Sequence, residues 1–171
     1  MTAFLYFMKA REYLYEIVEQ VTGARLTVSY GRIGGVKADL PGGIDENIQG
    51  ALKQVERELS EVDKLLTRNR IWVDRTRDVG VLTKENAIAH GITGPVARAS
   101  GINYDVRKAF PYFVYDRMRF EVPLGERGDN YDRYLVRMEE MRQSIRIIRQ
   151  ALDYMPKGPW NAPEAKVVLP E

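Results

Sequence analysis

The sequence predicts a mainly α-helical fold with little sheet. Three segments, at about residues 2–21, 45–66 and 129–155, carry apolar residues at steps of three and four, and this spacing places them on one face of a helix. Each segment is too apolar on that face to be stable alone in water. We therefore expect the three helices to pack together, joined by short strands and long irregular connections.

The first predicted helix runs from Thr2 to about Val21. Thr22-Gly23 follows it, and glycine readily takes the left-handed conformation that closes a helix. Arg11 falls on its apolar side, where a buried arginine would need a partner. We interpret Arg11 as half of a structural ion pair, with a polar functional site as the alternative.

Residues 24–43 contain two features before the second helix. Ala24 to Tyr30 alternates in polarity and is predicted to be a strand or an extended link. The glycine-rich stretch Gly31 to Lys37 is not a phosphate loop, because Val36 rather than glycine precedes the lysine. We interpret it as a tight glycine turn that carries Arg32 as a possible functional side chain.

The second helix is predicted from about Asp45 to Leu66, with an ordinary solvated outer face. A short helix should follow from Thr83, whose hydroxyl can cap it, to His90, with Gly91 at its end. His90 is the only histidine in the chain. Its position next to a helix-ending glycine favours a surface or capping role over catalysis, and no HExxH spacing suggests a metal site.

The segment from Arg98 to Phe120 is rich in tyrosine, arginine and aspartate. Asp105 and Arg107 are two residues apart, so they share a face if the segment is extended. The residues alone leave two interpretations open. The segment is either an ion-paired loop between helices or a group of charges that tunes a buried redox centre.

The third helix is the most strongly patterned part of the chain. Asp129 can cap its first turn, and Pro156 with Gly158 ends it. Its predicted apolar stripe consists of Tyr131, Leu135, Met138, Met141, Ile145, Ile148, Leu152 and Met155. The proline-containing tail from Lys157 to Glu171 is predicted to be an irregular extension.

Composition excludes several classes of function. The 171 residues suffice for one domain, and 26 basic against 24 acidic residues show no general nucleic-acid footprint. The absence of cysteine excludes disulfides, thiolate nucleophiles and cysteine-ligated clusters within this chain. The apolar run at the start is broken at Lys9, Arg11 and Glu12, so we expect neither a signal peptide nor a membrane span there.

Three strings of residues identify a family. YGRIGGVKADLP at 30–41, RASGINYDVRKAFPY at 98–112 and PLGERGDNYDRYLVRMEEMRQSIRII at 123–148 occur in this order. Together they resemble the D-type subunit of respiratory complex I, which forms a family similar to the large subunit of nickel–iron hydrogenases. The resemblance runs from Thr2 to about Pro159. It implies the helical core of the hydrogenase large-subunit-like fold, with residues 1–171 as a single partial domain that lacks the family's N- and C-terminal portions.

The resemblance also implies a function. In that family the subunit helps to form the quinone cavity of NADH:quinone oxidoreductase, beside a terminal iron–sulfur cluster that a smaller neighbouring subunit ligates. The expected substrate is a quinone, and the expected partners are the cluster-bearing subunit and the C-type subunit of the complex, with no nucleic acid. Membrane contact would occur only through the complex, at the cytoplasmic face of the bacterial inner membrane. Hydrogenase activity is excluded, because those enzymes hold their metal through cysteine.

Five residues match family positions of interest. Phe4 matches a residue close to the quinone cavity, and Arg32 matches the arginine of a glycine turn near the cluster end of the site. Arg98, Asp105 and Arg107 match a charged family motif. No catalytic or metal-ligating residue is expected in the chain itself.

The chain also departs from the family pattern. The histidine and tyrosine that hydrogen-bond the quinone headgroup, and an aspartate, belong to the portion that precedes this chain. Thr27 stands where many relatives carry a histidine near the cluster, and threonine does not titrate in the usable range. We therefore expect the isolated chain to be inactive.

Two alternative functions remain open at this point. One is the homologous subunit of a related complex that takes electrons from ferredoxin or another carrier, since the donor binds other subunits. The other is a non-catalytic interaction or scaffold module, which the helical stripes and the missing headgroup ligands would also suit.

Overall fold

The structure is a computed structural model that describes residues 1–162, and the tail predicted from Lys157 lies partly outside the described residues. It is mainly α-helical, which confirms the predicted fold class. The elements in chain order are α1 (Thr2–Thr22), β1 (Gly31–Arg32), β2 (Gly35–Val36), α2 (Ile44–Leu66), α3 (Arg70–Thr76), α4 (Lys84–Ala89), α5 (Gly94–Ala99), α6 (Val106–Ala109), the 3-10 turn η1 (Tyr115–Arg117) and α7 (Asn130–Asp153).

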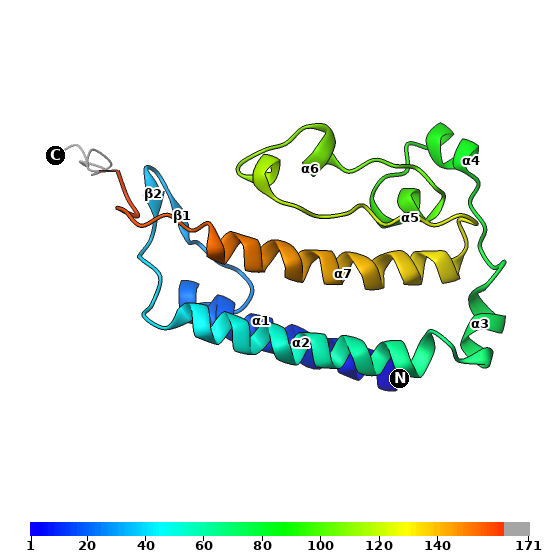
Figure 1. Cartoon of the computed structure of the whole chain (residues 1–171), viewed down its shortest axis with the longest axis horizontal. Helices are drawn as coiled ribbons and strands as arrows, with labels where there is room; N and C mark the ends of the chain where they lie inside the picture. The colour runs from blue at the N-terminus through cyan, green and yellow to red at the C-terminus, as the bar shows by residue number, and fades with distance from the viewer. Residues whose placement is uncertain (163–171) are drawn as a thin grey trace.

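The three long helices are those the apolar spacing predicts, and they form the core. Helices α1 and α2 lie side by side, and α7 lies along them (Figure 1). The core residues come from all three helices: Ala10, Leu52, Val55, Leu59, Val62, Met138 and Ile145. Burial of these side chains supplies the main stabilising free energy of this layer. Lys9 adds an ion pair across it, because its Nζ lies 2.7 Å from the buried carboxylate of Glu58.

A second layer covers the opposite side of α7. The chain between α3 and α7, which carries α4, α5 and α6, folds back along this helix (Figure 1). Helix α7 therefore has two covered faces. This explains why Val136 is buried although it lies off the predicted stripe, whereas Leu135, on the stripe, is exposed.

The predicted helix ends agree with the observed caps. Gly23 has φ 82° and its N–H donates to the carbonyl of Glu19, which closes α1. Thr83 caps α4, and the N–H of Asn86 donates to its hydroxyl. Four short elements were missed, namely α3, α5, α6 and η1. Each is too short to show a full apolar stripe.

The interpretation of Arg11 is wrong. Its side chain is exposed and donates to the hydroxyl of Tyr15 instead of pairing with a buried carboxylate. The reason is that no described element covers that face of α1. Phe4 on the same face is 62% exposed, and Leu14 is also exposed.

The sequence left residues 24–30 as either a strand or a link, and the structure decides between the two. Ala24 to Tyr30 contains no strand and is an irregular link with bends at residues 25–27, whereas the glycine-rich stretch forms the antiparallel hairpin β1–β2. The N–H of Val36 donates to the carbonyl of Trp160, and the N–H of Ala162 donates to the carbonyl of Gly34. A Cβ at Gly35 would lie 2.4 Å from the carbonyl oxygen of Trp160, so this close approach requires glycine.

Asp129 joins the start of α7 to the second layer. Its side chain is 0% exposed and accepts hydrogen bonds from the N–H groups of Asp78 and Asp132, each at 2.8 Å. The preceding Gly128 has φ 68°, and a Cβ there would lie 2.1 Å from the carbonyl oxygen of Leu82. The chain thus packs tightly around a carboxylate that caps the helix.

We predict that Asp129→Ala destabilises the chain by about 2–3 kcal/mol, because two buried N–H groups lose their acceptor. Chemical denaturation followed by circular dichroism measures the change in the free energy of unfolding. Asp153→Ala, at the exposed far end of the same helix, is the matched control and should change that free energy by less than about 0.5 kcal/mol. Equal effects of the two substitutions would contradict a special role for Asp129.

Candidate functional site

The structure brings three of the five predicted site residues together. Arg98 lies in the last turn of α5, Asp105 caps α6 and Arg107 lies in its first turn. The segment is therefore a helix start rather than the extended strand that the two-residue spacing assumed. Asp105 and Arg107 nevertheless meet, because an N-terminal cap residue folds its carboxylate back over the first turn.

The charges of this cluster pair with one another. Arg107 Nη2 donates to Asp105 Oδ2 at 2.7 Å and Arg107 Nε donates to Oδ1 at 3.0 Å. Arg98 Nε donates to Glu140 Oε1 at 2.6 Å, and its Nη1 donates to the carbonyl of Tyr104 at 3.1 Å. We call Arg98, Asp105, Arg107 and Glu140 the charged cluster.

Pairing shifts the ionisation of two members of the charged cluster. Hydrogen bonds from Arg107 hold the pKa of the Asp105 carboxyl below its usual range, in spite of partial burial. The same contact raises the pKa of Arg107. Arg107 also lies over the ring of Phe120, with its guanidinium carbon 4.7 Å from the ring centroid. Both ions therefore stay charged across the neutral range.

Glu140 is the member that sequence reasoning missed. It lies on α7, so no local pattern connects it to Arg98, 42 residues earlier. Its ion pair ties the second layer to α7. Because the cluster contains two cations and two carboxylates, its net charge is zero.

The remaining two predicted residues lie far from this cluster and from each other. Phe4 is near the start of α1, whereas Arg32 is on the hairpin near the other end of the long helices (Figure 1). A helix of the length of α1 spans about 30 Å. Both side chains are exposed. The described residues thus do not unite Phe4, Arg32 and the charged cluster into one pocket.

An apolar groove runs between the long helices. It has a volume of about 1090 Å³ and is lined mainly by side chains of α1, α2 and α7, with Trp72 from α3. Glu140 also lines it, so this member of the charged cluster borders the groove. The buried Trp72 Nε1 and Arg133 Nε have no hydrogen-bond partner within residues 1–162. The groove itself offers mainly apolar surface to an occupant.

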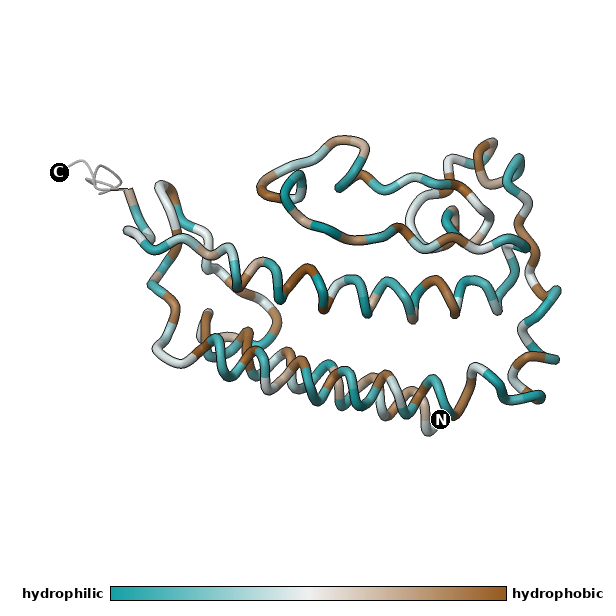
Figure 2. The backbone as a smooth tube through the Cα atoms, viewed as in Figure 1, coloured by the Kyte–Doolittle hydropathy of each residue, from teal (hydrophilic) through white to brown (hydrophobic). Residues whose placement is uncertain are grey.

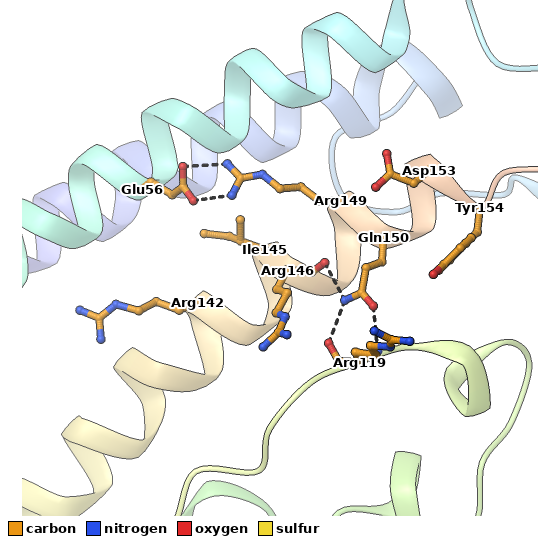
Figure 3. A pocket seen from close by; sticks show the side chains of 9 residues that line it. All are labelled: Glu56, Arg119, Arg142, Ile145, Arg146, Arg149, Gln150, Asp153 and Tyr154. Atoms are coloured by element: carbon orange, nitrogen blue, oxygen red, sulfur yellow. Dashed lines mark hydrogen bonds and ion pairs between the residues drawn. The ribbon is translucent and has the colours of Figure 1, made fainter.

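A smaller pocket of about 570 Å³ lies between α2, α7 and the chain at Arg119 (Figure 3). Arg149 donates to both oxygens of Glu56 at 2.8 Å, so the outer face of α2 is less purely solvated than its sequence suggests. Gln150 accepts from the N–H of Arg119 and donates to its carbonyl, each at 2.8 Å. These contacts fix the guanidinium of Arg149 and the backbone of Arg119 beside the pocket.

Residues 1–162 contain no group of three histidine, cysteine, aspartate or glutamate side chains placed to hold a metal ion. His90 is exposed next to the end of α4, and its Nδ1 lies 2.9 Å from the carbonyl of Asn86, which agrees with a capping role. Thr27 is exposed on the link between α1 and β1. None of the helices in this range has both the length and the apolar character needed to cross a bilayer.

Comparison with known proteins gives a consistent family. Residues 1–171 match the family described as the respiratory-chain NADH dehydrogenase 49 kDa subunit. The chain is 53% identical over 167 residues to the D-type subunit of NADH-quinone oxidoreductase of Myxococcus xanthus, which covers 98% of this chain and 40% of that protein. It is 54% identical over 163 residues to a C/D-type subunit of NADH-quinone oxidoreductase of Aquifex aeolicus, covering 95% of this chain and 28% of that protein.

A third relative, the D-type subunit of NADH-quinone oxidoreductase of Methylacidiphilum infernorum, is 49% identical over 170 residues, covering 99% of this chain and 41% of that protein. The chain therefore spans less than half the length of these relatives. The predicted resemblance to the D-type subunit is confirmed over nearly the whole chain. On the match of all 171 residues, the chain belongs to the family of the 49 kDa subunit of respiratory-chain NADH dehydrogenase.

Proposed function

We propose that this chain is part of the quinone-reducing module of NADH:quinone oxidoreductase. There it would help to form the quinone cavity beside the terminal iron–sulfur cluster of a neighbouring subunit. The observation that carries this proposal is the family match over residues 1–171, together with relatives of about 50% identity that are named as subunits of NADH-quinone oxidoreductase. The chain would act as a subunit and would be inactive alone.

Phe4 and Arg32 are the candidates for direct contact with the cavity. Phe4 presents an exposed ring on the uncovered face of α1, which suits contact with an apolar quinone. Arg32 lies on a hairpin whose backbone is hydrogen-bonded to the chain at Trp160. The hairpin backbone is anchored in this way, and the exposed guanidinium of Arg32 would stabilise negative charge that develops on the quinone as electrons arrive.

The charged cluster has a positioning role in this proposal. Its four charges cancel, so its field at a distance is weak, and redox tuning is the less favoured of the two interpretations. Its ion pairs instead hold α5 and α6 against α7. This favours the structural account of Arg98, Asp105 and Arg107.

The apolar groove would be covered by polypeptide of the longer subunit. The relatives are more than twice as long as the stretch this chain matches, which provides ample chain to fill it. An amphipathic helix suits a groove between helices, because its apolar face would bury the apolar side chains that line the groove. Contacts with the cluster-bearing subunit and the C-type subunit, at the cytoplasmic face of the inner membrane, complete the proposed setting.

The proposed role in quinone reduction can be tested in a chimera, whichever electron donor the complex uses. This chain replaces the matching segment of the D-type subunit in a bacterium that makes NADH-quinone oxidoreductase, and quinone reduction is measured in membranes. We predict that Arg32→Gln lowers the rate at least about tenfold, equivalent to about 1.4 kcal/mol, because charge stabilisation in the cavity is lost. Arg68→Gln, which changes an exposed arginine after α2, should leave the rate unchanged.

Assembly is measured in parallel by co-purification of the other subunits. A fully active, assembled Arg32→Gln complex would contradict the cavity role of Arg32. A chimera that never co-purifies with the cluster-bearing subunit would contradict membership in the module and favour a separate scaffold role.

The ion pair between Asp105 and Arg107 predicts how the free energy of unfolding depends on pH. The folded-state pKa of Asp105 is depressed, so its stabilising contribution is present above its unfolded pKa, about 3.9, and is lost as the pH falls through the folded value. We predict that Asp105→Asn reduces the free energy of unfolding at pH 7 by about 2–3 kcal/mol and flattens its decline in acid. Denaturation of the 171-residue chain between neutral and acidic pH measures both effects. Asp116→Asn, at an exposed aspartate, should reproduce the wild-type pH profile, and an identical profile for Asp105→Asn would refute the assigned ion pair.

A further inference from the structure

The hairpin that carries Arg32 has little apolar packing to hold it in place. Strands β1 and β2 have two residues each, and a two-stranded hairpin alone is only marginally stable in water. Of residues 31–36, only Val36 is partly buried, and Ile33 at the tip is 82% exposed. Much of the hairpin is pale in Figure 2, because several of its residues are glycines. Burial of apolar side chains therefore does little to fix the position of Arg32.

A later segment of the chain crosses the hairpin. Residues 160–162, which we call the crossing segment, follow α7 and lie beside the hairpin (Figure 1). The N–H of Val36 donates to the carbonyl of Trp160 at 3.2 Å, and the N–H of Ala162 donates to the carbonyl of Gly34 at 2.8 Å. The crossing segment thus pairs with the outer edge of β2 and joins the hairpin to the end of α7.

Gly35 is the residue that connects the crossing segment to Arg32. It pairs with Arg32 in the antiparallel ladder β1–β2, and it pairs with Asn161 in an isolated antiparallel bridge. Residues paired across antiparallel strands have Cα atoms about 4.5–5.5 Å apart, so the backbone of Arg32 lies two strand spacings from the crossing segment. A shift of the crossing segment therefore reaches Arg32 through a single intervening residue.

The contact at Gly35 is too close for any side chain. A Cβ there would lie 2.4 Å from the carbonyl oxygen of Trp160 and 2.8 Å from the Cα of Asn161, and both are backbone atoms. Ordinary contacts begin at 3.4 Å, so the crossing segment would have to withdraw by about 1 Å to admit a methyl group. Asn161 Oδ1 lies 3.1 Å from the same Cβ position, is buried and has no donor within residues 1–162. A buried acceptor without a donor costs free energy, and the chain keeps this close approach despite that cost.

We propose that the crossing segment, acting through Gly35, positions Arg32 for quinone reduction. This inference rests on the proposed role of Arg32 in the quinone cavity. A guanidinium lowers the barrier to charge development only from a fixed position, and a displacement of about 1 Å can lower a rate up to about a hundredfold. Gly35 and the crossing segment are positioning residues that act through Arg32. Because the crossing segment follows α7, it also ties Arg32 to the helix against which both layers pack.

The test is a double-substitution cycle in the chimera complex, with each rate of quinone reduction divided by the amount of assembled complex. Gly35→Ala should lower kcat about three- to tenfold and leave the KM for quinone within about twofold, because Arg32 acts on charge that develops during reduction. In the Arg32→Gln background, Gly35→Ala should change kcat by less than about twofold, since the group that it displaces is absent. Gly50→Ala on α2 is the matched control, because a Cβ there meets nothing within 4 Å, and it should leave kcat unchanged.

A second variant breaks the crossing without filling the space at Gly35. Ala162→Pro removes the N–H that donates to the carbonyl of Gly34, so it should lower kcat in the same way. Hydrogen exchange of the assembled complexes, followed by mass spectrometry, reports on the crossing directly. The amide of Val36 should exchange faster in Gly35→Ala and in Ala162→Pro than in the unsubstituted complex, whereas Gly50→Ala should leave its exchange unchanged.

The outcomes separate this inference from the proposed function. Unchanged kcat in either Gly35→Ala or Ala162→Pro, or losses that multiply when Gly35→Ala is combined with Arg32→Gln, would overturn the inference alone. Failure of both variants to assemble would also overturn it, because the crossing segment would then serve assembly rather than the position of Arg32. An assembled Arg32→Gln complex that reduces quinone at the full rate would instead contradict the proposed cavity role of Arg32.

Discussion

The rest of the structure depends on α7 being covered on two faces. One face supplies Met138 and Ile145 to the apolar core with α1 and α2, where burial drives association. The other face buries Val136 and holds the second layer through Glu140 and Gln143, which bind Arg98 and the N–H of Glu121. Asp129 ties the start of the helix to the same layer. If α7 had only one of these faces, either the apolar core or the second layer would lose the helix surface against which it packs.

This arrangement divides the proposed site into an exposed part and a buried part. The charged cluster is neutral overall and lies between α5, α6 and α7, so it fixes positions rather than presenting charge. Phe4 and Arg32 lie on surfaces that no described residue covers, and the uncovered groove adds a third such surface. In the proposed function, polypeptide outside this chain would cover these open faces.

Local patterns predicted the long elements well because each repeats its signal over several turns. The stripes of α1, α2 and α7 and the caps at Gly23, Thr83 and Asp129 all depend on residues close in sequence. The short helices α3, α5 and α6 escaped prediction because their four to seven residues hold too few apolar positions to show a period. Arg11 was misplaced because periodicity identifies an apolar face without showing whether anything covers it.

The sequence by itself determined the helical class, the main boundaries, the absence of cysteine chemistry and, through three strings of residues, the family. Tertiary structure alone decided which charges meet: Arg98 with Glu140, Lys9 with Glu58, and Arg149 with Glu56. It also decided that Val136 is buried while Leu135 is exposed, and that the ring of Phe113 projects into solvent. The physical reason is that these outcomes depend on contacts between residues dozens of positions apart. Helical periodicity relates only residues a few positions apart and carries no information about such contacts.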